Sequence, residues 1–127
     1  MKLYIGGYAQ GKLNYVLKQT NISPDRVFDA AMAADGIIPE DTMILNHFHA
    51  WVRRCLLESR DPEKETASMI LRNPQIIIIS DEVGNGIVPM DAFEREYRER
   101  LGRILCDLAE KAERVERILC GIGQRIK

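Results

Sequence analysis

The sequence has no apolar run near the ~20 residues that a membrane-spanning helix needs, and aromatic residues make up only 6% of the chain. Its N-terminal apolar stretch is too short for a secretory signal peptide and has no cleavage-site pattern. Acidic and basic side chains nearly balance at a formal net charge of -1, so no strong field favours nucleic acid or anionic membranes. We therefore expect a cytoplasmic protein with neither a nucleic acid nor a membrane as partner.

Cysteine is also scarce. The three cysteines, Cys55, Cys106 and Cys120, are widely spaced and form no C-x-x-C pair of the kind that binds zinc. We predict that they are reduced and mostly buried as small apolar side chains.

What is present suits one globular domain. The 127 residues are 46% hydrophobic and 29% charged, which is ordinary for a soluble domain with a single core. We predict one domain over residues 1–127.

The first third of the chain predicts a strand, a helix and a second helix. Lys2–Gly6 is a short apolar run that stops at a glycine pair, and apolar residues at helical spacing follow over Lys12–Thr20. Ser23 precedes a proline, a pattern typical of a helix N-terminus, so a helix is predicted over Asp25–Ala34. A strand over Val27–Ala31 is the weaker alternative.

The rest of the chain continues the alternation. Its predicted elements are, in order, a strand over Thr42–Leu45, a helix over His47–Glu58, a helix over Lys64–Leu71, a strand over Ile76–Ile79, a loop over Ser80–Pro89, a helix over Asp91–Ala112 and a strand over Val115–Cys120. The run of four isoleucines is typical of a parallel strand covered on both faces. This order predicts an α/β fold with a mainly parallel sheet, in which ligands bind at the carboxyl ends of the strands.

A glycine-rich turn between the first strand and the first helix satisfies the phosphate-binding pattern G-x-x-x-x-G-K. Its predicted nucleotide-binding residues are Gly6, Gly7, Tyr8, Ala9, Gln10, Gly11, Lys12 and Leu13. Backbone N–H groups and a helix N-terminus would surround a phosphate there, and Lys12 would reach the β and γ phosphates. The next residue should carry a hydroxyl for Mg²⁺, but Leu13 cannot bind a metal. The alternative is an ordinary turn with a solvated Lys12.

Three further patterns carry polar side chains. Asp81 and Glu82 follow the isoleucine strand, where carboxylates suit a metal or polar ligand; solvated carboxylates on a surface loop are the alternative. His47 and His49 do not share a helical face, so they make a poor metal pair; we expect a strand end passing into a helix, with the following tryptophan in the core. On the long helix, Arg98 and its neighbouring arginines would reach a phosphate if that face borders the site.

These segments resemble the adenosylcobinamide kinase/guanylyltransferase family. The N-terminal strand with its Gly-Gly-x-x-x-Gly-Lys turn is similar to the start of that family. The stretch Ile76–Pro89 is similar to its hydrophobic strand and Glu-Val-Gly-x-Gly-Ile-Val-Pro loop. Arginine-rich and glycine-containing segments after residue 94 fit the same pattern. The resemblance covers about residues 1–18 and 42–127.

The resemblance implies a P-loop NTPase-like three-layer fold and a role in cobalamin biosynthesis. It implies that GTP or ATP binds with Mg²⁺, that the corrinoid adenosylcobinamide is a partner, and that the chain forms a homo-oligomer, a trimer. By resemblance, Lys12 and Glu82 are catalytic, Glu82 is a metal ligand, and Arg98 contacts the nucleotide.

Three departures from the family pattern limit this expectation. Leu13 replaces the metal-binding hydroxyl, and Asn46 stands where the family has an aspartate at a strand end. Residues 21–41 contain no histidine, although the family carries its guanylylated histidine in that segment. We therefore predict that the guanylyltransferase step is lost. Three hypotheses stay open: a reduced kinase, a non-catalytic module that binds a nucleotide or corrinoid, and an assembly protein.

Overall fold

The computed structural model describes residues 1–83 and 91–127 and contains one six-stranded sheet, in the order β2-β3-β4-β1-β5-β6. Its strands are β1 (Lys2–Gly6), β2 (Val27–Asp29), β3 (Ile44–Asn46), β4 (Ile77–Asp81), β5 (Arg114–Leu119) and β6 (Ile122–Arg125). The first five are parallel, and β6 pairs antiparallel with β5. β1 is central: Gly6 lies opposite Asp81 of β4 and Ile118 of β5.

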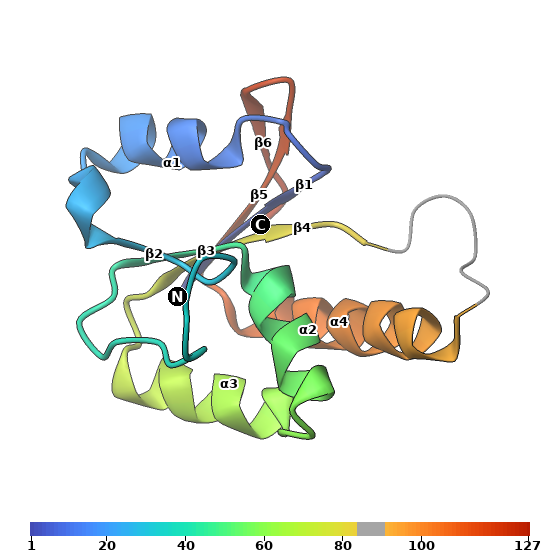
Figure 1. Ribbon diagram of the computed structural model, residues 1–127. Coiled ribbons are helices and arrows are strands. Elements are labelled where there is room, and N and C mark those ends of the chain that lie inside the picture. Colours follow the sequence, from blue (N-terminus) through green and yellow to red (C-terminus); the bar gives the residue numbers. More distant parts are fainter. Residues whose placement is uncertain (84–90) are drawn as a thin grey trace.

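Helices cover both faces of the sheet, giving three layers (Figure 1). The helices are α1 (Lys12–Thr20), α2 (Phe48–Leu57), α3 (Pro62–Arg72) and α4 (Ala92–Lys111). α1 lies alone on one face, and the other three share the opposite face. The fold is therefore α/β and three-layered with a mainly parallel sheet, as the sequence predicts.

The alternation of strand side chains builds a core on each face. Leu3 and Ile78 point into the larger core, which they share with Phe48 and Trp51 of α2 and Leu101 of α4. The smaller core lies under α1 and contains Tyr4, Val16, Ile44, Ile77, Ile79 and Ile118. The isoleucine run is thus buried on both faces, as expected of a central parallel strand.

The predicted helix over Asp25–Ala34 is wrong. The proline after Ser23 starts only a 3₁₀ turn, Pro24–Arg26, and the chain then enters the sheet as β2. Val27 pairs with Ile44 of β3, so pairing with a neighbouring strand outweighs the local helix signal. The weaker alternative, a strand over Val27–Ala31, is the correct one in kind.

The predicted elements end with the strand that forms β5 and do not include β6. Cys120 and Gly121 form a two-residue turn with φ of 51° and 74°, the left-handed region typical of tight hairpins. β6 then returns beside β5. Gly123 leaves room for Tyr15, because a Cβ on it would lie 2.2 Å from the end of the Tyr15 side chain.

The cysteine prediction is only partly correct. Cys55 is buried, and burial raises the pKa of its thiol to about 11. Cys106 and Cys120 are exposed, against expectation; all three are free thiols. Among the residues described, no helix is both long and apolar enough to cross a membrane.

Candidate functional site

The candidate site lies at the carboxyl ends of the parallel strands, where β1 and β4 lie side by side. The chain leaves β1 through α1 on one face and leaves β4 toward α4 on the other (Figure 1). Neighbouring strands whose connections diverge to opposite faces open a crevice at their carboxyl ends, where ligands of such sheets bind. The glycine-rich turn at 6–11 lies at this position.

The turn curls tightly. A Cβ on Gly6 would lie 2.5 Å from the carbonyl oxygen of Ile118, so only glycine lets β1 end this close to β5. Ala9 and Gly11 both have positive φ, 55° and 80°, which turns the chain back toward the first residue of α1. Gly11 is the N-cap of that helix, so Lys12 begins α1 directly after the turn.

The β5–β6 hairpin holds the turn in place. The side-chain Oε1 of Gln10 accepts a hydrogen bond from the N–H of Cys120 at 2.7 Å, and its carbonyl accepts the N–H of Gly121 at 2.8 Å. The side chain of Tyr8, by contrast, is 85% exposed. The turn is therefore fixed at Gln10 and open to solvent at Tyr8.

Lys12 points into the turn and is only 8% exposed. Its Nζ donates to the carbonyl oxygen of Gly7 at 2.7 Å and lies 2.6 Å from Oδ1 of Asp81, the last residue of β4. The Asp81 side chain is itself only 14% exposed. The alternative with a solvated Lys12 is therefore not what the structure contains.

His49 completes this cluster from α2. Its Nδ1 accepts the backbone N–H of Asp81 at 3.0 Å, which leaves the hydrogen of the neutral ring on Nε2, 3.5 Å from Oδ2 of Asp81. Burial lowers the pKa of His49, and the Asp81 carboxylate opposes this shift. Tyr97 of α4 supports His49 by donating its hydroxyl to the His49 carbonyl at 3.2 Å, and burial raises the Tyr97 pKa to about 12.

A second histidine–carboxylate pair lies on the next strands of the sheet. His47 follows β3 with φ of 58°, and its Nδ1 is 2.6 Å from Oδ1 of Asp29 at the end of β2. The same carboxylate oxygen accepts the N–H of Ala31 at 3.0 Å, which fixes its orientation. The rings of His47 and His49 meet edge to face with centroids 5.6 Å apart.

The predicted passage from strand to helix with Trp51 in the core is confirmed.

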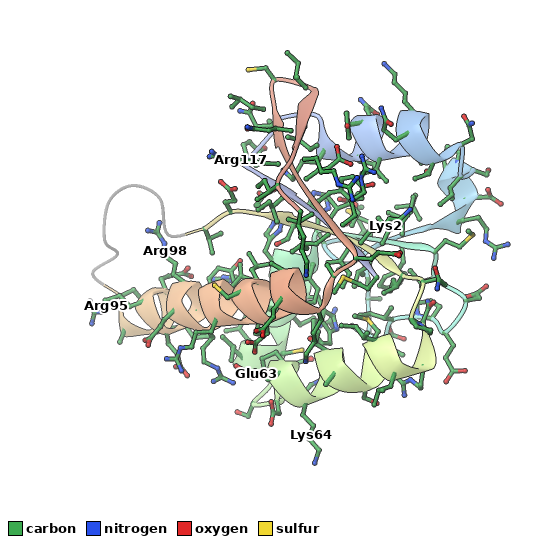
Figure 2. The ribbon with its side chains drawn as sticks, turned by 180° about the vertical axis from the view of Figure 1, so that it is seen from behind. Lys2, Glu63, Lys64, Arg95, Arg98 and Arg117 are labelled. Atoms are coloured by element: carbon green, nitrogen blue, oxygen red, sulfur yellow. The ribbon has the colours of Figure 1, made fainter. Side chains whose placement is uncertain are left out.

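Glu82 follows Asp81 at the end of β4, and Arg98 lies on α4. Glu82 forms a two-pronged ion pair with Arg117 of β5, both distances being 3.1 Å. Arg98 projects from the first half of α4 (Figure 2). The segment Gly84–Pro89, part of the loop that resembles the family hallmark, lies outside the described residues.

The donor atoms next to Lys12 do not suit a resident magnesium ion. Leu13 offers no oxygen, and the carboxylates of Asp81 and Glu82 each already pair with a cation. In residues 1–83 and 91–127, no group of three His, Cys, Asp or Glu side chains could hold a metal ion. The role of Glu82 as a metal ligand stays a prediction.

The sequence identifies the turn and Lys12. It indicates Asp81 only as a carboxylate suited to a metal or polar ligand, not as the partner of Lys12, and it indicates no site role for His49. Asp81 had one available signal, because it ends the isoleucine strand. Its contact with Lys12, however, depends on β4 pairing directly with β1. The rule that two histidines at i and i+2 do not share a helical face does not apply to this pair, because His47 precedes α2 and only His49 lies within it.

Comparison with known proteins decides the ancestry. The family model described as cobinamide kinase / cobinamide phosphate guanyltransferase matches residues 18–126. The chain belongs to this family. Two relatives, from Salmonella typhimurium and Escherichia coli, are each named bifunctional adenosylcobalamin biosynthesis protein CobU. Each is 38% identical to the chain over 53 residues, which is 42% of this chain and 29% of the relative.

The family match does not reach the glycine-rich turn, and a nucleotide-related role in cobalamin biosynthesis comes to this chain as a proposal. The family match begins at residue 18, after the glycine-rich turn. The assignment of the turn to phosphate binding therefore depends on its own sequence pattern and geometry. The aligned stretch covers less than a third of each CobU relative, so the activities in their names come to this chain only as proposals.

Proposed function

We propose that the chain binds the phosphates of a nucleoside triphosphate, GTP or ATP, in the turn formed by Gly6–Lys12. The observation that carries the proposal is the inward-pointing Lys12, nearly buried at the divergence of β1 and β4 and beginning a helix. A lysine at this point supplies the charge, and the helix N-terminus supplies N–H donors, for a phosphate group.

Several finer parts of the proposal have the family pattern as their support. We propose that the chain acts in cobalamin biosynthesis, that a corrinoid such as adenosylcobinamide is its second ligand, and that it forms a homo-oligomer, by resemblance a trimer. We further propose that the guanylyltransferase step is absent, because residues 21–41 contain no histidine. Glu82 and Arg98 are proposed as further groups of the site.

Phosphoryl transfer itself is the less supported function. Transfer depends on a metal ion that neutralises charge on the phosphates. Leu13 replaces the hydroxyl of the family pattern, and Asn46 replaces its carboxylate with a neutral amide, which is a weaker partner for Mg²⁺. The neighbouring carboxylates are ion-paired. The geometry thus favours binding over turnover, with a non-catalytic module for a nucleotide or corrinoid as the preferred form.

Calorimetric titration with GTP and with ATP tests the binding proposal. Lys12→Ala should weaken binding roughly 100-fold, since it removes from the protein the desolvated positive charge that would contact the ligand phosphate. Lys18→Ala is the matched control, because Lys18 is an exposed lysine in the last turn of the same helix. Equal affinity of wild type and Lys12→Ala would refute the phosphate-binding assignment.

Two further measurements separate the forms of the proposal. Affinity that does not change between Mg²⁺ and EDTA supports the non-catalytic module. Incubation of labelled GTP with adenosylcobinamide at high protein concentration tests the kinase, and transfer of label would replace the module with an enzyme. Light scattering in solution tests the oligomer, which a monomeric mass would exclude.

A further inference from the structure

The ammonium group of Lys12 already has two oxygen partners within the protein. It contacts the carbonyl of Gly7 and the carboxylate of Asp81, both from within or beside the turn that is proposed to hold phosphates. These oxygen atoms surround Lys12 as phosphate oxygens would. A ligand phosphate that contacts Lys12 must therefore take the place of the Asp81 carboxylate or share the lysine with it.

The contact between Lys12 and Asp81 is poorly solvated. The two side chains are 8% and 14% exposed, so water screens their attraction little. The same low exposure strengthens the repulsion between the Asp81 carboxylate and an incoming anion. A ligand with one or two charges gains little by the exchange, whereas a polyphosphate brings several charges and further contacts with the N–H groups of the turn.

We infer that Asp81 is a specificity-determining residue that competes with ligand phosphate for Lys12 and so makes the turn selective for polyphosphates over single phosphates. The inference depends on the proposed function, because it needs the turn to be a phosphate site. Asp81 is a positioning and competing group here, and no bond is made or broken.

The surroundings of Asp81 fit this role. Its backbone N–H is held by His49 Nδ1, and its register opposite Gly6 places it at the mouth of the turn. The Nε2 of His49 lies 3.5 Å from the carboxylate oxygen that Lys12 does not use. His49 is thus in place to donate to the carboxylate when Lys12 turns to a ligand.

The test is calorimetric titration of the full chain with inorganic tripolyphosphate and with orthophosphate in metal-free buffer. Asp81→Asn keeps the side-chain volume and removes the charge, and we expect it to bind tripolyphosphate about tenfold tighter than wild type. We expect orthophosphate affinity to rise by at least the same factor, so that the preference for tripolyphosphate narrows.

Glu63→Gln is the matched control, because it removes the charge of an ion-paired carboxylate on α3 that contacts Arg100 and not Lys12. Its affinities should stay within about threefold of wild type. The double variant Lys12→Ala/Asp81→Asn should lose the gain, since the gain passes through Lys12. Circular dichroism checks folding, and Asp81→Ser replaces Asp81→Asn if the latter unfolds.

Each outcome bears on one of the two proposals. If wild type binds through Lys12 but neither Asp81 variant binds more tightly, the inference is wrong and the proposed function stands. If wild type binds orthophosphate as tightly as tripolyphosphate, the selectivity is wrong whatever the variants do. If no folded protein binds either probe, both proposals fail.

Discussion

Two ion pairs, each between one basic and one acidic side chain, lie in different regions of the molecule. Lys12 and Asp81 meet at the carboxyl end of the sheet, with side chains 8% and 14% exposed. Arg100 of α4 and Glu63 of α3 meet on the helical layer, 28% and 40% exposed. The arginine grips its carboxylate with two hydrogen bonds of 2.8 and 2.7 Å, which lowers the pKa of Glu63 to about 2.

The comparison indicates that the Arg100–Glu63 pair holds two helices together, whereas the Lys12–Asp81 pair can exchange its carboxylate for another anion. The planar guanidinium of Arg100 matches the carboxylate at two points and joins two helices. The ammonium of Lys12 is a point charge on a flexible stem, and it can turn to another anion without losing a matched geometry. Solvent screens the Lys12 pair less because it is more buried, and its location makes it the pair that a ligand can replace.

The largest expected effect comes from breaking the buried pair. Lys12→Met should lower the free energy of unfolding by about 3 kcal/mol, because it leaves the Asp81 carboxylate poorly solvated and without its cation. Chemical denaturation monitored by circular dichroism measures the change. The double variant Lys12→Met/Asp81→Asn should recover most of the loss. A single variant as stable as wild type would show that the pair is not desolvated.

Breaking the half-exposed pair should have a smaller effect. Arg100→Gln should cost about 0.5–1 kcal/mol near neutral pH, since solvent screens the pair. The pKa of Glu63 is lowered in the fold from 4.5 to about 2. The stabilisation is therefore present above pH 4.5 and lost as the pH falls toward 2.

Arg100→Gln should accordingly be less sensitive to acid than wild type across this interval. Urea denaturation at a series of pH values measures the two slopes. Parallel slopes would mean that Arg100 does not set the Glu63 pKa.

Salt should distinguish the two pairs further. Raising ionic strength from about 0.05 to 1 M shortens the screening length to ~3 Å, which weakens exposed pairs more than buried ones. Double-mutant cycles at both salt concentrations should show a larger fractional loss of coupling for Arg100–Glu63 than for Lys12–Asp81. An equal fractional loss would mean that solvent reaches both pairs alike.

The smallest effect is expected on the surface of α4. Arg103 pairs with Glu99 one helical turn away, and both side chains are about two-thirds exposed, at 67% and 66%. Arg103→Gln should change the free energy of unfolding by no more than ~0.5 kcal/mol. Thermal unfolding beside wild type measures it. A loss of stability as large as that of Arg100→Gln would mean that side-chain exposure does not determine how much each ion pair contributes.

Much of the fold could be predicted because local patterns agreed with the final packing. The strand–turn–helix at 2–20, the isoleucine strand and the long amphipathic helix have strong periodicity, and the structure contains them. β2 could not be predicted with the same success, since its three residues gain their structure from pairing with β3. The β5–β6 turn could not be predicted in the same way, because a non-glycine residue such as cysteine seldom adopts the left-handed conformation that Cys120 has here.

The candidate site was predictable to the extent that it is contiguous in sequence. Lys12 and the glycines form one motif, and a motif can be read along the chain. Asp81 and His49 reach Lys12 from β4 and α2, so their contact depends on strand order. A sequence pattern does not specify the order of strands in a sheet, so only the structure identifies Asp81 as the partner of Lys12.

The central position of β1 has a consequence for synthesis of the chain. β1 precedes both of its neighbours along the chain, since β4 and β5 begin at Ile77 and Arg114. A nascent chain that stops before Arg114 leaves one edge of β1 open, and it also lacks the hairpin that holds Gln10. β5 and β6 must therefore leave the ribosome before the glycine-rich turn can take its final shape, so earlier folding intermediates would expose an unpaired apolar strand to chaperones.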